Sequence, residues 1–127
     1  MNPETEIFLI VGTDTGVGKT VFTGLSARFL MDAGVGVRAV KPFCSGGRED
    51  IEFMTAVQGG ALDQEDLNFW YSDEPISPAA WELRHGQAVD FDGCIAWIQQ
   101  KYAEAGVLLV EGVGGGGARD NAQESSF

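Results

Sequence analysis

Apolar residues form short, uninterrupted runs at two places in this chain, and a third segment also has the character of a strand. Ile7–Val11 and Val107–Val110 contain no polar residue, and Gly36–Lys41 has strand-like composition up to Pro42. Runs of this length are typical of parallel strands that are covered on both faces. We therefore predict three buried parallel strands, with the second lying beside the first in a right-handed βαβ unit.

Between the first two runs, apolar residues recur with the period of a helix. Phe22, Leu25 and Phe29 share one face of a segment that opens at Lys19 and stops before Gly34. This spacing predicts an amphipathic helix that connects the first strand to the second.

Further helices are predicted downstream. A short helix is expected over Glu49–Gln58, and another begins at Pro78 with Ser77 as its cap. The clearest helix follows Asp90, which can cap it. Its apolar stripe comprises Phe91, Ile95, Ile98, Tyr102 and Ala105.

The other segments show no regular spacing of apolar residues. Phe43–Arg48 and Gly59–Ser77 are predicted to be irregular, and so is the tail, 114–127. Three strands make a thin sheet, since a typical sheet has about five or six. We interpret residues 1–127 as a single α/β domain that is incomplete at its C-terminus, as expected for the amino-terminal part of a larger domain.

Charge and cysteine content narrow the possible functions. The formal net charge of −11 argues against a general nucleic-acid or anionic-membrane binder, because phosphate backbones repel such a surface. Cys44 and Cys94 are far apart in the sequence, which fits a reducing compartment better than a disulfide scaffold. The acidic start resembles neither a signal peptide nor a membrane anchor. We expect a cytoplasmic protein that acts on small molecules.

The stretch GTDTGVGKT follows the first predicted strand and leads into the first predicted helix. We interpret it as the phosphate-binding pattern G-x-x-x-x-G-K-[ST], in which backbone N–H groups and a helix N-terminus surround phosphate oxygens. Lysine would then reach the β- and γ-phosphates of ATP, and threonine would bind Mg²⁺. The fold class is accordingly a P-loop NTPase-like α/β fold, with a parallel sheet flanked by helices. The predicted nucleotide-binding residues are Gly12, Thr13, Asp14, Thr15, Gly16, Val17, Gly18, Lys19 and Thr20.

Three further side chains are candidates for the same site. Lys41 and Glu111 each end a predicted strand, and ligands bind at this edge of open parallel sheets. A carboxylate there would complete the coordination of phosphate-bound Mg²⁺, and Glu111 is the stronger candidate. Asp50 is the weaker one, because it also fits a charged turn that caps a helix. Lys41 would add a second cation, suited to a substrate that accepts a phosphoryl group.

Taken together, GTDTGVGKT, KPFCSG and VEGVGG resemble the dethiobiotin synthetase family in sequence and order. SPAA, Ser77–Ala80, is also similar to a stretch of that family, and the likeness extends from Ile7 to about Gly115. The resemblance implies an ATP-dependent ligase that forms the ureido ring of dethiobiotin from 7,8-diaminononanoate and CO₂ (or bicarbonate). It also implies a homodimer, and further strands and helices after EGVGG.

The resemblance assigns roles to individual positions. It implies that Lys19 and Lys41 act on the carbamate and the phosphates, and that Thr15 and Ser45 lie beside the substrate. It implies Mg²⁺ ligands at Thr20, Asp50 and Glu111, the last also contacting the nucleotide.

Two other interpretations remain open. One is a related P-loop ligase of the cobyrinic acid amidase type, which phosphorylates a carboxylate before amidation. The other is a truncated chain that only binds nucleotide or lacks activity. Partition-type ATPases are disfavoured, because Asp14 stands where they carry an additional lysine.

Overall fold

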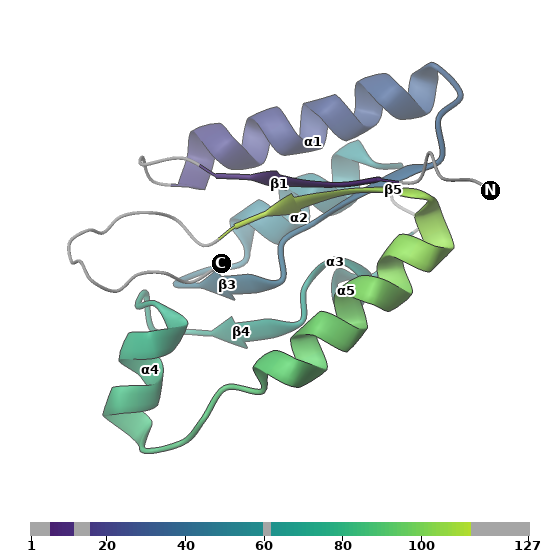
Figure 1. The fold of residues 1–127 in the computed structure, drawn as a ribbon. Helices are drawn as coiled ribbons and strands as arrows, with labels where there is room; N and C mark the ends of the chain where they lie inside the picture. Colours follow the sequence, from purple (N-terminus) through teal and green to yellow (C-terminus); the bar gives the residue numbers. More distant parts are fainter. Residues whose placement is uncertain (1–5, 12–15, 60–61, 113–127) are drawn as a thin grey trace.

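The computed structural model of this chain describes residues 6–11, 16–59 and 62–112, which form an α/β arrangement of ten helices and strands (Figure 1). In chain order these are β1 (Glu6–Ile10), α1 (Gly16–Asp32), β2 (Val37–Val40), β3 (Phe43–Ser45), α2 (Glu49–Val57), α3 (Gln64–Leu67), β4 (Trp70–Ser72), α4 (Pro78–His85), α5 (Phe91–Ala105) and β5 (Val107–Glu111).

The main sheet has three parallel strands in the order β1-β5-β2. Three parallel strands were predicted, but the prediction that β2 lies beside β1 is wrong. β5, the last described strand in the sequence, lies between them and pairs with both. Its central place agrees with its burial, since Leu108, Leu109 and Val110 are all in the core.

Helices cover both faces of this sheet. α1 and α2 lie on one face and α5 on the other (Figure 1). Gly24 allows the close packing of α1 on α2, because a Cβ atom there would lie 2.8 Å from the ring of Phe53. This layering confirms the predicted α/β class with a parallel sheet flanked by helices.

A second, smaller sheet pairs β3 with β4 in parallel. Both strands, and the one-turn helix α3, lie in segments that were predicted to be irregular. Each strand has three residues, too few for a period to be recognised. The turn after β3 requires glycine, because Gly46 has φ +83° and a Cβ atom would lie 2.9 Å from Pro75.

The other predicted helices are confirmed. The hydroxyl of Ser77 accepts a hydrogen bond from the N–H of Ala80 at the start of α4, and Asp90 accepts one from Gly93 at the start of α5. The predicted apolar stripe of α5 is only partly correct. Ile98 is buried as expected, but Phe91 and Ile95 are exposed. The fully buried side of α5 carries Cys94, Ile98 and Lys101.

The prediction that β1 is covered on both faces is wrong. Ile7, Phe8, Leu9 and Val11 are between 46% and 64% exposed. The reason is position: β1 is an edge strand whose one strand neighbour, within the described residues, is β5. The apolar stripe of α1 is likewise on the surface, where Phe22, Leu25 and Phe29 are 51–72% exposed.

Two predictions concern residues outside the described part of the chain. They are the conformation of the loop at 12–15 and the irregular tail at 114–127. Among the described residues, no helix combines the length and apolar character needed to span a bilayer.

Candidate functional site

The adjacent strands β2 and β5 bring two charged side chains together at their carboxyl ends. Val40 of β2 is paired with Val110 of β5, so the next residues, Lys41 and Glu111, lie side by side. Nζ of Lys41 donates a hydrogen bond to Oε2 of Glu111 at 2.9 Å. Both residues are buried, with Glu111 only 1% exposed.

Thr20 in α1 contacts the same carboxylate. Its hydroxyl lies 2.9 Å from Oε1 and 3.1 Å from Oε2 of Glu111, and its single proton is shared between them. Thr20 is itself buried. The carboxylate of Glu111 therefore joins α1 to the ends of β5 and β2.

Lys19 completes the cluster with a second buried ammonium group. Its Nζ atom has no hydrogen-bond partner among the described residues, and the side chain is only 8% exposed. Burial lowers the pKa of Lys19, and the positive charge of Lys41 lowers it further, while Glu111 and Asp50 act in the opposite direction. A buried cation without a hydrogen-bonded anion is suited to receive an anionic ligand.

Asp50 also lies close to Lys41. It belongs to the first turn of α2, and its Oδ2 atom is 3.7 Å from Nζ of Lys41. The cluster thus contains two lysines, two carboxylates and a hydroxyl. Carboxylate and hydroxyl oxygens are the protein ligands that Mg²⁺ accepts, so the donor set fits this metal.

Asn68, which sequence reasoning missed, holds the backbone at Lys41. Its Nδ2 group donates to the carbonyl oxygens of Lys41, Pro42 and Trp70 at distances of 2.9–3.1 Å. The N–H of Lys41 is also bonded, to the carbonyl of Leu67. No sequence pattern marked Asn68, because one amide in an irregular segment carries no period.

The remaining candidate residues are Ser45 and the residues of the loop before α1. Ser45 ends β3, and its neighbour Cys44 is within electrostatic reach of Lys41, Asp50 and Glu111. Burial is the main cause of the raised pKa of Cys44. Four loop residues lie outside the described part of the chain: Gly12, Thr13, Asp14 and Thr15.

Two details of the loop prediction need correction. α1 begins at Gly16 and not at Lys19, so Val17 and Gly18 are also in its first turn. Counting along the sequence, five residues separate Gly12 from Gly18, one more than in the pattern G-x-x-x-x-G-K-[ST]. The match therefore rests on the Gly18-Lys19-Thr20 end, at a helix N-terminus that follows a strand.

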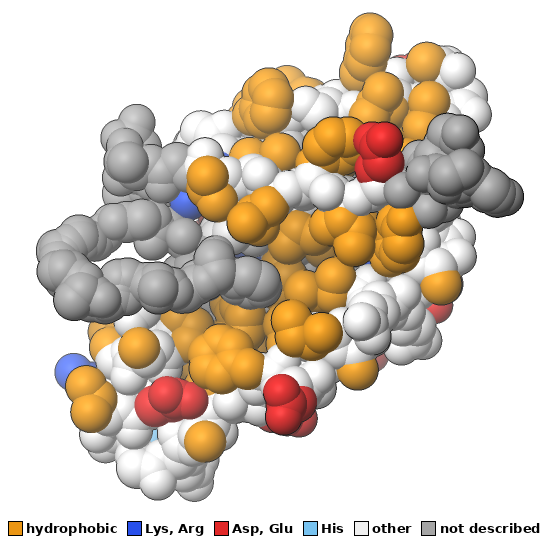
Figure 2. All heavy atoms as spheres, in the orientation of Figure 1, with side chains coloured by type: hydrophobic (Ala, Val, Ile, Leu, Met, Phe, Trp, Pro, Cys, Tyr) orange, Lys and Arg blue, Asp and Glu red, His pale blue; other side chains and the backbone are white. Residues whose placement is uncertain are grey.

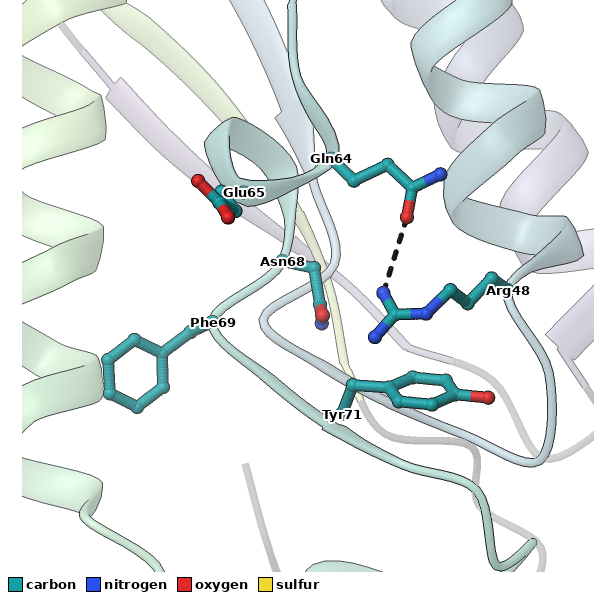
Figure 3. A pocket seen from close by; sticks show the side chains of 6 residues that line it. All are labelled: Arg48, Gln64, Glu65, Asn68, Phe69 and Tyr71. Carbon is teal, nitrogen blue, oxygen red and sulfur yellow. Dashed lines mark hydrogen bonds between the residues drawn. The ribbon is translucent and has the colours of Figure 1, made fainter.

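A separate surface hollow lies between α2, α3 and β4 (Figure 3). The guanidinium of Arg48 lies 3.8 Å from the centre of the Tyr71 ring and donates to Oε1 of Gln64. The Phe69 ring points away from the hollow, towards α5 (Figure 3), where it packs on Trp97. None of the residues that line the hollow belongs to the Lys19–Glu111 cluster.

Comparison with known proteins agrees with the resemblance inferred from the motifs. The chain is 34% identical to the ATP-dependent dethiobiotin synthetase of Hydrogenobaculum sp. (strain Y04AAS1), over 86% of this chain and 50% of the relative. It is 39% identical to the enzyme of the same name from Gloeobacter violaceus, over 84% of this chain and 46% of the relative. A third such relative, from Pasteurella multocida, is 32% identical over 96% of this chain and 61% of its own length. The chain therefore spans about half the length of these curated relatives.

A family comparison covers almost the whole chain. Residues 6–125 match the family described as "AAA domain". The matched range includes the helix N-terminus with Lys19 and Thr20, both strand ends, and Glu111. This chain belongs to the AAA domain family.

Proposed function

We propose that this chain supplies the phosphate-binding and phosphorylating part of an ATP-dependent dethiobiotin synthetase. The observation that carries the proposal is the cluster in which Glu111 binds both Thr20 and Lys41 near the ammonium of Lys19. Support also comes from the relatives, which are named as ATP-dependent dethiobiotin synthetases.

The reaction forms and breaks bonds in three stages. One amine of 7,8-diaminononanoate adds to CO₂ and loses a proton, which gives a carbamate. A carbamate oxygen then attacks the γ-phosphorus of ATP, and the bond from this phosphorus to ADP breaks. Finally the second amine attacks the carbamoyl carbon, phosphate leaves with the C–O electron pair, and the ureido ring closes.

Lys19 is proposed to bind the transferred phosphoryl group. Its ammonium is buried and has no hydrogen-bond partner among the described residues, so a phosphate oxygen would provide the missing acceptor. The N-terminus of α1 adds unpaired N–H groups with a positive dipole end. Gly18 leaves room for the ligand, since a Cβ atom there would meet nothing within 4 Å in the described part of the chain.

Lys41 is proposed to face the carbamate. An ammonium group has three N–H donors, and the hydrogen bond to Glu111 uses one of them. Glu111 and Asp50 both lie within ion-pair distance of this cation and hold it in place. A fixed positive charge at this point stabilises the negative charge that the carbamate oxygen and the phosphoryl group share during transfer.

Magnesium is part of the proposal. Thr20 and Glu111 would hold the ion, with Asp50, which is 3.7 Å from Nζ of Lys41, as a further carboxylate. When bound, Mg²⁺ neutralises charge on the β- and γ-phosphate oxygens. Substrate contacts at Thr15 and Ser45, a homodimeric assembly and a cytoplasmic location also belong to the proposal.

ADP release tests the proposed reaction. The purified chain is incubated with ATP, Mg²⁺ and bicarbonate, with and without 7,8-diaminononanoate, after its folding is verified by circular dichroism. We expect the diamine to raise the rate of ADP release at least tenfold. A folded sample whose rate is unchanged by the diamine would contradict the ligase proposal, and acceleration by a carboxylate substrate with ammonia would favour an amidase.

A further inference from the structure

Helix α5 buries a charged side chain and exposes apolar ones. Its buried residues are Cys94, Ile98 and Lys101, and Lys101 is only 7% exposed. On its outer side Phe91 and Ile95 are exposed, and Figure 2 shows hydrophobic side chains gathered across the face of the molecule that carries α1, β1 and α5. Lysine is seldom fully buried unless it is paired, so the place of Lys101 indicates an interaction that holds it there.

The main partner of Lys101 lies on α3. Nζ of Lys101 is 3.6 Å from Oδ1 of Asp66 and 3.8 Å from Oε1 of Glu104 on its own helix. The other carboxylate oxygen of Asp66, Oδ2, accepts a hydrogen bond from the N–H of Asp63 at 2.8 Å and so caps the start of α3. The hydrogen bond from Asp63 and, to a smaller extent, the charge of Lys101 lower the pKa of Asp66. Asp66 therefore attaches the one-turn helix α3 to α5.

A second contact joins α5 to the residue that lies three positions after Asp66. The ring of Phe69 points towards α5 (Figure 3), and its centre is 6.0 Å from that of the Trp97 ring. Aromatic pairs at this distance attract each other in addition to burying apolar area. Helix α5 thus contacts both ends of the segment Asp66–Phe69, which we call the brace.

The middle of the brace holds the backbone of Lys41. The carbonyl of Leu67 accepts a hydrogen bond from the N–H of Lys41 at 2.8 Å, and Nδ2 of Asn68 donates to the carbonyl of Lys41 at 3.0 Å. Both backbone polar groups of Lys41 are therefore bonded to the brace, which fixes the direction in which its side chain leaves the backbone. At the far end of that side chain, Nζ lies 2.9 Å from Glu111 and 3.7 Å from Asp50.

We propose that Asn68 is a positioning residue for Lys41, and that the brace couples the place of the Lys41 ammonium to helix α5. A lysine side chain is long and loses much rotamer freedom when its ammonium is held at one point, so a fixed backbone leaves it fewer positions to occupy. A catalytic group that is misplaced by about 1 Å can slow a reaction about 100-fold. Asn68 acts through Lys41 and not on the substrate. This inference rests on the role proposed above for Lys41.

Side-chain NMR of the lysines tests the position of Lys41 without an activity measurement. The sequence contains three lysines, Lys19, Lys41 and Lys101, so a chain labelled with ¹⁵N-lysine gives three Nζ signals, which lysine-to-arginine variants assign. The signals are detected through the carbon-bound hydrogens of each side chain. In Asn68→Ala we expect the Lys41 signal to move towards its position in the unfolded chain, and the other two to stay in place.

Two further variants sharpen this comparison. Gln64→Ala is the matched control, because Gln64 also belongs to α3 but its side chain binds Arg48 and not Lys41. It should leave all three signals unchanged. Lys101→Met separates the brace from α5 while Asn68 stays intact, and it should move the Lys41 signal in the same direction by a smaller amount. Circular dichroism verifies folding, and Lys101→Met decides the question if Asn68→Ala does not fold.

Kinetics provide a second readout. In the ADP-release assay with 7,8-diaminononanoate, Asn68→Ala is expected to lower kcat at least about tenfold and to leave the KM for ATP within about twofold, because Lys19 and the start of α1 are unaltered. A role in stability alone would lower the amount of folded protein and leave kcat per folded molecule unchanged. The Gln64→Ala control should match the wild-type chain in both constants.

Three outcomes would overturn the inference. The first is a folded Asn68→Ala chain in which the Lys41 signal does not move. The second is an equal movement of all three lysine signals, which would indicate a general loosening of the fold. The third is an altered Lys41 signal with an unchanged kcat. If the wild-type chain itself shows no diamine-dependent ADP release, the proposed function fails, and the NMR comparison still decides whether Asn68 positions Lys41.

Discussion

Thr20 and Glu111 are 91 residues apart in the sequence, yet the hydroxyl of Thr20 lies 2.9 Å from Oε1 of the Glu111 carboxylate. Both side chains are buried, and the same carboxylate binds Lys41. Two candidate ligands of one metal ion are thus already in contact, and a lysine from a third element completes the group. Four substitutions test this cluster, the hydrogen bonds of Gln58 at the outer edge of β2, and one buried thiol.

Lys19→Ala is expected to weaken ATP binding at least about tenfold, because a charge-assisted hydrogen bond is worth roughly 1.5–3 kcal/mol. Titration with a fluorescent ATP analogue in the presence of Mg²⁺ measures the change. Lys101→Ala is the matched control: Lys101 is as buried as Lys19 (7% against 8% exposed) but pairs with Asp66 of α3 and Glu104 of α5. Equal losses in both variants would show that burial, and not phosphate binding, explains the effect.

Glu111→Gln is expected to lower the free energy of unfolding by about 3 kcal/mol, because it leaves the buried Lys41 without its closest counter-ion. Urea denaturation measures the loss. The control Glu104→Gln removes the half-exposed carboxylate that pairs with Arg38 and Lys101. Lys101 keeps its pair with Asp66, and the expected loss is below about 1 kcal/mol. Similar values for the two variants would mean that the buried pair contributes no more than a surface pair.

Gln58→Met keeps the length of the side chain but removes both hydrogen bonds to Ala39. Two buried backbone groups would then be unsatisfied, and we expect a loss of about 2–4 kcal/mol. Faster hydrogen exchange at the Ala39 amide should accompany the loss. Gln100→Met, on the exposed side of α5, should change stability by less than about 0.5 kcal/mol. An unaltered Ala39 exchange rate would contradict the hydrogen bonds between Gln58 and the backbone of Ala39 at the outer edge of β2.

Ionisation of Cys94 makes the stability of the chain depend on pH, and the direction of this dependence is defined. Burial, with a smaller effect of the Asp90 charge, raises the pKa of its thiol from 9.0 to about 11. The unfolded chain therefore ionises first, so the stabilisation by the neutral thiol is complete below pH 9 and is lost as the pH rises through about 11. The stability advantage of the wild-type chain over Cys94→Ala should shrink between pH 8 and pH 10.5, as measured by urea midpoints. A constant difference would contradict the raised pKa.

Much of the fold was predictable because strands and helices leave regular patterns of apolar residues in the sequence. The apolar runs predicted β1 and β5, and strand-like composition predicted β2. Helical periods predicted α1 and α5 within a few residues, and a short helix was also expected at α2. The meeting of Lys41 with Glu111 was also predictable, because the carboxyl ends of parallel strands share one edge of a sheet. It did not depend on the strand order, which was predicted incorrectly.

What the sequence did not predict depends on single side chains or on neighbours in space. Gln58 and Asn68 act through individual amides, which have no period. β3 and β4 are too short to carry one. The exposure of Phe22, Leu25 and Phe29 could not be foreseen, since an apolar stripe indicates that a surface will be covered but does not identify what covers it.

The central place of β5 has a consequence for synthesis on the ribosome. β1 and β2 leave the ribosome early, yet neither has its sheet partner until residues 107–111 emerge. Until then Thr20 and Lys41 also lack the carboxylate that joins them. The nascent chain therefore has to keep two apolar strands apart, and the cluster of Thr20, Lys41 and Glu111 assembles only in the late step that inserts the fifth strand between them.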